Sequence, residues 1–136
     1  MLPRQAVKRI AADLLRTGVR RSGVLLVHSS LSSLGRVPGG PETVVRGLLG
    51  ALGSEGTLLL PALSYMFVTP ERPVFDVQKT PANVGAIPEH FRTRRGTRRS
   101  IHPTHSVCAV GPLADELLTG HELDNTPCGP HSPFHR

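Results

Sequence analysis

Aromatic residues and cysteine are scarce in this sequence of 136 residues. Tryptophan is absent, there are one tyrosine and four phenylalanines, and the only cysteines are Cys108 and Cys128. Proteins that bind single-stranded nucleic acid by stacking need aromatic platforms, so this composition speaks against that class. Two thiols in a chain without a secretion signal more often stay reduced than pair, and we therefore expect free cysteines.

Long apolar segments and the common nucleotide-binding loops are also missing. No apolar run approaches the ~20 residues that a membrane-spanning helix needs, and charges interrupt the first 15 residues too often for a signal peptide. We therefore expect a cytoplasmic protein without a membrane partner. Neither GxxxxGK[ST] nor GxGxxG occurs, which speaks against triphosphate or dinucleotide sites of those two types.

Lysine is nearly absent, so the positive charge comes from arginine. Arginine outnumbers lysine 14 to 2, and the net charge is +6. The planar guanidinium suits phosphate groups, so a phosphorylated cofactor and nucleic acid are both compatible with this charge, as is a simple compositional bias. The length allows one domain, or part of one.

Apolar periodicity predicts an alternation of helices and strands. Helical spacing is found over residues 6–17, 41–52, 87–94 and 113–118, and short apolar runs typical of strands over 23–28, 56–61 and 106–110. Strand 23–28, helix 41–52 and strand 56–61 form a βαβ unit, whose two strands are parallel. We therefore expect an α/β fold with a mainly parallel central sheet flanked by helices, in which strand 23–28 is buried on both faces.

A proline-rich stretch separates the second strand from the third helix. Residues 62–85 contain Pro70, Pro73 and Pro81 and show no sustained periodicity. We expect a long ordered loop there. Loops of this length in compact domains are usually functional, which makes it a candidate substrate lid or wall, and an ordinary insertion is the alternative.

The passage from the first strand to the second helix, residues 28–42, is rich in hydroxyls and glycine. Its serine side chains, its backbone amides and the free N–H groups of helix 41–52 can converge on an anion. The passage therefore resembles a cradle for phosphate or pantetheine. A plain connecting loop is the alternative.

A basic run at residues 92–99 leads into a segment with several histidines. Five arginines lie within eight residues, and either a solvated loop or a contact with cofactor phosphates explains them. His102 and His105 lack the helical spacing of a HExxH zinc site, so we expect no metal. A basic nucleic-acid-binding module that uses this run remains an alternative from a different class.

Five stretches, taken in order, resemble the aminoglycoside 3-N-acetyltransferase family of antibiotic N-acetyltransferases. They are VLLVHSSLSSLGRVPGG, GTLLLPALS, FDVQKTPANVGAIPEHFR, RRSIHPTHSVCAVG and CGPHSPF. The resemblance implies that family's α/β fold, distinct from the GNAT fold. It also implies transfer of acetyl from acetyl-coenzyme A to the 3-amino group of a 2-deoxystreptamine antibiotic, which confers resistance. Another small amine is the alternative acceptor.

The resemblance also implies which residues contact the ligands. The expected coenzyme A contacts are His28, Ser29, Ser30, Ser32, Ser33, Gly35, Arg36, Val37, Arg99, Ser100, His102 and Ser106. Tyr65 and Asp76, on the long loop, are the expected contacts of the amine substrate.

The resemblance further implies that residues 1–136 form the N-terminal half of one acetyltransferase domain. Nothing here resembles the family's catalytic histidine and its acidic partner, so we expect the base beyond Arg136. A positioned base typically contributes ~10² to 10⁴-fold to such a reaction, and this chain by itself is therefore expected to be slow or inactive. Assembly into a homo-oligomer is a further possibility that the sequence leaves open.

Overall fold

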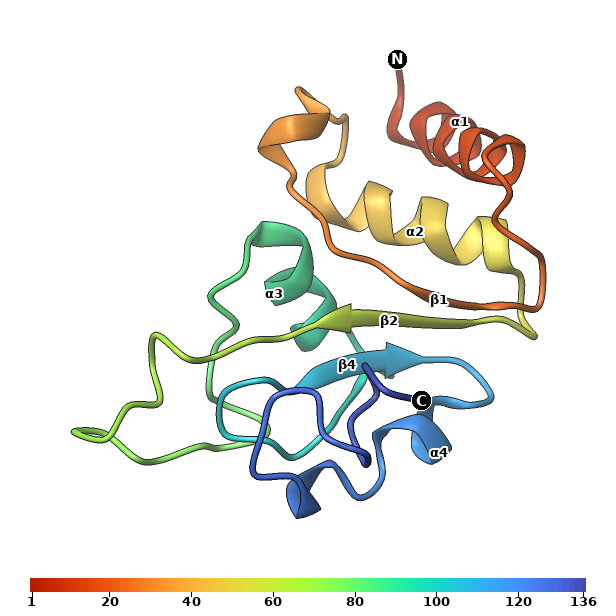
Figure 1. Cartoon of the computed structure of the whole chain (residues 1–136). Helices are drawn as coiled ribbons and strands as arrows, with labels where there is room; N and C mark the ends of the chain where they lie inside the picture. Colours follow the sequence, from red (N-terminus) through yellow and green to blue (C-terminus); the bar gives the residue numbers. More distant parts are fainter.

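Helices and strands alternate along the chain in the computed structural model, which describes residues 1–136 (Figure 1). The α-helices are α1 (Pro3–Arg16), α2 (Gly40–Leu52), α3 (Ala86–Thr93) and α4 (Ala114–Leu118), the strands are β1 (Val24–Leu26), β2 (Thr57–Pro61), β3 (Arg98–Arg99) and β4 (Val107–Val110), and two 3₁₀ turns are η1 (Ser32–Leu34) and η2 (His121–Leu123). Every helix and strand predicted above is present within a few residues of its expected bounds. Residues 62–85 form no helix or named strand, as expected.

The four strands form one mixed sheet in the order β1-β2-β4-β3. β1 and β2 are parallel, with Leu25 opposite Leu58, which confirms the βαβ unit through α2. β4 is antiparallel to both β2 and β3. β1, β2 and β3 therefore run in one direction, and β4, which lies between β2 and β3, runs in the other. The sheet is mixed because β3 returns to β4 through a short connection rather than through a helical crossover.

Helices cover both faces of this sheet (Figure 1). The larger core lies under α2 and α3, where Leu52, Ile87 and Phe91 pack against Leu58 and Leu60. A smaller core on the other face joins β2 and β4 to α4. β2 is buried along its whole length because alternate side chains of a strand point into the two cores.

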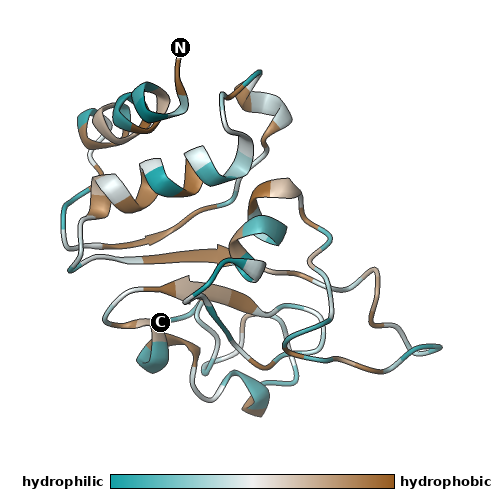
Figure 2. Cartoon of the chain, turned by 180° about the vertical axis from the view of Figure 1, so that it is seen from behind, coloured by the Kyte–Doolittle hydropathy of each residue, from teal (hydrophilic) through white to brown (hydrophobic).

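β1 is an exposed edge strand. Leu25 packs against the larger core, but Val24 and Leu26 on the opposite face are 53% and 38% exposed. Figure 2 shows the apolar colouring of this strand at the border of the sheet. The prediction that it is buried on both faces is wrong, because α4 packs mainly against β2, β3 and β4.

The basic run contains a strand that the sequence did not predict. β3 consists of Arg98 and Arg99, which pair with Ala109 and Cys108 of β4. Polar side chains gave this segment no apolar periodicity, so only the tertiary structure reveals it. None of the helices has the length and apolar character that a membrane-spanning segment requires.

Candidate functional site

The loop after β1 is folded back on itself by its own serine side chains. Ser30 Oγ and Ser32 Oγ share a hydrogen bond of 3.0 Å, and Ser33 Oγ donates to Ser30 Oγ at 3.1 Å. The 3₁₀ turn η1 follows, and Gly35 ends it with a φ of 72°, a conformation that favours glycine. These local bonds hold the hydroxyls together beyond the carboxyl end of β1.

A hollow of about 490 Å³ opens between this loop and the start of α3, and we call it the serine hollow. Its lining residues come from the two segments 29–35 and 84–86, and they are Ser29, Ser30, Leu31, Ser32, Gly35, Val84, Gly85 and Ala86. Ala86 begins α3, and the first N–H groups of a helix have no partner within it. The hydroxyls thus face the N-terminal end of α3, whereas the sequence predicted the following helix, α2.

Ser29 carries a hydroxyl that has no hydrogen-bond partner. Its Oγ atom is buried from solvent and unbonded, although the residue as a whole is only half-buried. A buried hydroxyl without a partner is unfavourable by about 1–3 kcal/mol. The wall of the serine hollow therefore includes a polar group that has no partner within the protein.

An apolar hollow of about 290 Å³ adjoins the same loop on the side of α1 and α2. It shares the segment 28–30 with the loop, and aliphatic side chains of Ile10, Leu14, Val44 and Leu48 form its wall. The serine hollow, with its hydroxyl groups, and the apolar hollow therefore meet at Ser29 and Ser30. This combination suits a ligand that has both hydrogen-bonding groups and an aliphatic portion.

The structure brings part of the first predicted contact group together. Ser29, Ser30, Ser32 and Gly35 line the serine hollow, and His28 and Ser33 line the apolar hollow. Arg36 is exposed and lines neither hollow, and Val37 packs against the larger core. The contact of the loop with coenzyme A remains a prediction.

The second predicted contact group lies in the interior, away from the serine hollow. Ser106 is fully buried, donating to the carbonyl of Ala62 (3.0 Å) and accepting from Arg99 Nε (2.8 Å). Ser100 shares a hydrogen bond of 2.8 Å with His121 Nδ1. These side chains have hydrogen-bond partners within the protein, and their contact with coenzyme A remains a prediction.

His102, the remaining member of that group, is also buried. It is 4% exposed, and its ring stacks on that of His121 with centroids 4.6 Å apart. The pKa of His102 is lowered mainly by burial and secondly by the neighbouring His105. The pKa of His121 is likewise lowered mainly by burial and secondly by His102. This stacked pair joins the β3–β4 connection to η2.

The two predicted substrate contacts occupy separate parts of the long loop. Tyr65 is 48% exposed and stacks on His105 with centroids 6.0 Å apart. The carboxylate of Asp76 accepts from the backbone N–H groups of Lys79 (3.0 Å) and Gln78 (2.8 Å), which lowers its pKa. Asp76 thus stabilises a turn of the loop, and no bond joins it to Tyr65. A substrate role for either residue remains a prediction.

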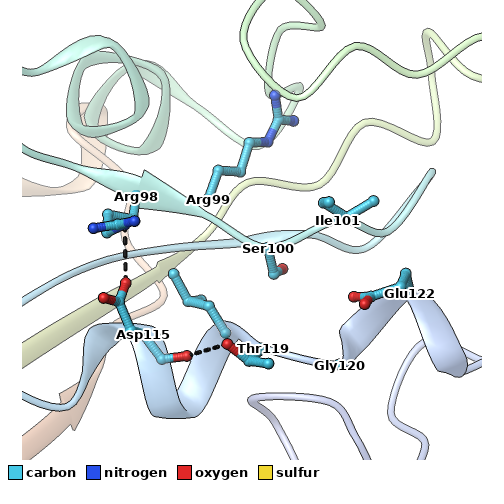
Figure 3. A pocket seen from close by; sticks show the side chains of 9 residues that line it. Arg98, Arg99, Ser100, Ile101, Asp115, Thr119, Gly120 and Glu122 are labelled. Carbon is cyan, nitrogen blue, oxygen red and sulfur yellow. Dashed lines mark hydrogen bonds and ion pairs between the residues drawn. The ribbon is translucent and has the colours of Figure 1, made fainter.

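A different hollow, of about 240 Å³, lies between β3 and α4 (Figure 3). Arg98 at one side pairs with Asp115 at 2.9 Å, and Glu122 lies at the other side. Arg99 points away from it, towards the long loop (Figure 3). The sequence did not indicate this hollow, because it depends on β3 lying beside α4.

Two histidine–carboxylate pairs were also missed by sequence reasoning. His131 Nδ1 and Asp124 Oδ1 are 2.9 Å apart, and His90 Nε2 and Glu42 Oε2 are 2.7 Å apart. Burial alone would raise the pKa of Asp124, but the hydrogen bonds from His131 outweigh it and lower that pKa. Neither histidine lines a hollow described above. The location of the catalytic base beyond Arg136 therefore remains a prediction.

The two cysteines lie in different environments, one inside the fold and one at the surface. Cys108 is buried and Cys128 exposed, and both are free. Burial raises the pKa of the Cys108 thiol to about 12, so the thiol is neutral near pH 7. No three side chains of the histidine, cysteine, aspartate and glutamate types come together in a way that could hold a metal ion.

Comparison with known proteins places this chain in a family. The model of the family described as aminoglycoside 3-N-acetyltransferase matches residues 26–136. Aminoglycoside N(3)-acetyltransferase IX of Micromonospora chalcea is 34% identical, over 94% of this chain and 51% of that protein. Aminoglycoside N(3)-acetyltransferase VIII of Streptomyces fradiae is 33% identical, over 94% of this chain and 50% of that protein.

Solved structures with the same fold include YokD of Bacillus subtilis, with a TM-score of 0.86 and 31% identity over 95% of this chain and 59% of that one. AAC-IIIb, solved as a binary complex with CoASH, has a TM-score of 0.83 and 32% identity over 95% of this chain and 54% of that one. The chain thus spans about half the length of the curated relatives it matches. The matched residues include the loop after β1, α3 and the β3–β4 region. The chain therefore belongs to the aminoglycoside 3-N-acetyltransferase family.

Proposed function

We propose that this chain forms the coenzyme A side of an acetyltransferase. The enzyme would transfer acetyl from acetyl-coenzyme A to the 3-amino group of a 2-deoxystreptamine antibiotic. The observation that carries the proposal is the serine hollow with the unbonded Ser29 Oγ, in a chain that matches the family from residue 26 onward. AAC-IIIb with CoASH and AAC-VIa bound to sisomicin support both ligand classes by analogy.

The two adjoining hollows fit different parts of acetyl-coenzyme A, the carrier of the acetyl group. Amide and phosphate oxygens of the carrier can accept hydrogen bonds from the hydroxyl of Ser29 and from the free N–H of Ala86. The aliphatic wall formed by Leu14, Val44 and Leu48 suits the methylene and methyl groups of a pantetheine arm. In this arrangement the loop binds and orients the thioester.

The reaction itself requires a free amine. The nitrogen of the acceptor forms a bond to the thioester carbonyl carbon, the carbon–sulfur bond breaks, and the thiol of coenzyme A leaves. The amine must lose a proton before or during the attack, which is the task of a base. His28 is the one imidazole that lines these two hollows, and on the resemblance to the family we propose that the base lies beyond Arg136.

Isothermal titration of the full chain with acetyl-coenzyme A tests the proposal. We expect saturable binding, and we expect Ser29→Ala to weaken it by about tenfold if one hydrogen bond to a charged group is lost. Ser54→Ala is the matched control, because Ser54 is exposed in a turn remote from both hollows. A sample with intact circular dichroism that gives no heat at any accessible concentration would overturn the proposal.

Turnover provides a second measurement. Release of the coenzyme A thiol can be followed with a thiol reagent after sisomicin is added to the chain and acetyl-coenzyme A. We expect binding of acetyl-coenzyme A with slow or no release of the thiol, because the base is proposed to lie beyond Arg136. Release as fast as in a full-length relative would contradict the assignment of the base to residues outside this chain.

A further inference from the structure

Two aromatic rings lie together at the base of the long loop. Tyr65 stacks on His105, with ring centroids 6.0 Å apart and an angle of 28° between the ring planes. Tyr65 is 48% exposed, so that much of its ring is accessible, whereas His105 is half-buried. The two residues therefore present an aromatic surface to solvent, which we call the tyrosine platform.

Hydrogen bonds of neighbouring residues fix both rings. Ser64, which precedes Tyr65, is fully buried, and its N–H donates to the carbonyl of Thr104 at 2.9 Å. The N–H of His105 donates to His102 Nδ1 at 2.9 Å, and the imidazole of His105 shares a hydrogen bond of 2.9 Å with Thr104 Oγ1. A surface held in this way loses little conformational freedom when a ligand covers it.

The tyrosine platform lies at the same edge of the sheet as the serine hollow (Figure 1). β1 and β2 are parallel, so their carboxyl ends share an edge, and β4 begins at that edge because it is antiparallel to β2. Ser29 follows β1, Tyr65 follows β2 and His105 precedes β4. Neighbouring strands are ~4.8 Å apart, so two strand spacings, ~10 Å, separate the ends of β1 and β4 at this edge.

A short segment connects the platform to the serine hollow. Met66 N–H donates to Asn83 Oδ1 at 3.2 Å, and Asn83 N–H donates to the carbonyl of Leu63 at 2.7 Å. Val84, the next residue, lines the serine hollow. A ligand on the platform would therefore lie next to a ligand in the hollow.

The platform is uncharged near neutral pH. Burial lowers the pKa of His105, so its imidazole is neutral near pH 7. A neutral aromatic surface accepts a cation without repulsion, and an ammonium group over the face of a tyrosine is attracted by the electrons of the ring. The chemistry of this surface therefore suits a cationic amine.

We propose that the tyrosine platform binds an ammonium-bearing ring of the amine acceptor, through an amino group other than the one that is acetylated. The inference rests on the proposed function, because it names the residues that hold the acceptor beside the same hollow. The amine that reacts must lose a proton, whereas an ammonium group on the platform keeps its charge and fixes the ring. Tyr65 and His105 would thus favour acceptors that carry two or more amino groups.

The single tyrosine provides a direct test. The chain has one tyrosine and no tryptophan, so its intrinsic fluorescence comes from Tyr65. Titration of the full chain with sisomicin at constant ionic strength is expected to change this fluorescence in a saturable way. Glucose, a sugar without an amino group, is expected to cause no change at the same concentrations. An equal response to the two compounds, or no response of the folded chain to sisomicin, would overturn the proposal.

Variants distinguish the ring from the rest of the loop, with sisomicin binding measured by calorimetry and folding checked by circular dichroism. Tyr65→Phe keeps the aromatic face and is expected to retain binding, whereas Tyr65→Leu is expected to weaken it by about two- to fivefold. His105→Lys adds a positive charge beside Tyr65 and is also expected to weaken binding. Phe67→Leu is the matched control, because Phe67 is 40% exposed on the same segment and lies outside the stack. Equal affinities of Tyr65→Leu and Tyr65→Phe would refute the platform.

Titration with acetyl-coenzyme A separates this inference from the proposed function. If acetyl-coenzyme A binds but sisomicin leaves the fluorescence of Tyr65 unchanged, the platform is wrong and the carrier site is unaffected. If sisomicin changes that fluorescence but acetyl-coenzyme A does not bind, the carrier site is wrong and the platform is supported. A change caused by acetyl-coenzyme A alone would mean that the platform contacts the carrier, which also overturns the inference.

Discussion

Arg99 shows how one side chain can connect segments that are far apart in the sequence. Its guanidinium donates to the carbonyls of Ala62 and Thr80, which lie near opposite ends of the long loop. The same group lies over the ring of Phe75, 4.9 Å from the centroid. Arg99 therefore fixes the long loop against the sheet. Burial lowers its pKa, but an arginine remains charged near pH 7.

Replacing this residue is expected to reduce stability. Arg99→Gln removes charged donors from several part-buried acceptors, and we expect a loss of about 2–3 kcal/mol in the free energy of unfolding. Arg98→Gln serves as the control, because the Arg98–Asp115 pair is 65% and 68% exposed and exposed pairs contribute about 0–1 kcal/mol. Urea unfolding monitored by circular dichroism measures both. Equal losses in the two variants would refute the role of Arg99 as a structural link.

At the scale of elements, the stacked histidines connect the β3–β4 connection to η2. The rings of His102 and His121 face each other inside the fold, with His105, Glu122 and Asp124 as the nearest titratable neighbours. Both imidazoles have a lowered pKa because they are buried, and because each has another histidine close by. The native state therefore favours their neutral forms.

This arrangement predicts a dependence of stability on pH. Because the pKa of each histidine is lower in the folded state, the unfolded chain binds more protons below pH ~6.5. The stabilisation is thus fully present above that pH and is lost as the pH falls through the folded pKa. Urea unfolding at a series of pH values measures it, and we expect His102→Gln to reduce the slope between pH ~7 and ~5.

His135→Gln is the control for that series, because His135 is exposed and lies outside the stacked pair. Its slope is expected to match that of the unmodified chain. A slope that is unchanged in His102→Gln would show that the stacked pair does not cause the pH dependence.

At the scale of the whole molecule, the sheet ends at β1 in an uncovered edge. Val24 and Leu26 expose apolar side chains beside the unpaired backbone of this strand. Such edges are templates for association with another strand. The structure therefore has an apolar border on the side opposite β3.

Charge at this border is expected to limit self-association. Leu26→Glu places a carboxylate on the exposed face of β1, while Leu25, which packs on the core, is untouched. We expect less concentration-dependent association in sedimentation velocity and light scattering. Leu123→Glu, at a 68% exposed position on η2, is the control and is expected to leave association unchanged. If both variants behave like the unmodified chain, the β1 edge does not drive association.

The sequence by itself determined most of the elements. Helical spacing in α1 and α2, apolar runs in β2 and β4, and the hydroxyl-rich segment 28–37 are local patterns that need no knowledge of the fold. The resemblance to the family rested on the same local stretches. These predictions hold because local periodicity follows from which face of an element is buried.

Tertiary structure alone decided which segments meet. It made β4 antiparallel to β2, placed the start of α3 beside the loop that follows β1, and left β1 at an edge. It also turned Ser106 inward, where its hydroxyl bonds to Arg99 and to the carbonyl of Ala62. Strand direction, edge position and hydrogen-bond partners depend on residues far apart in the chain, and no local pattern encodes them.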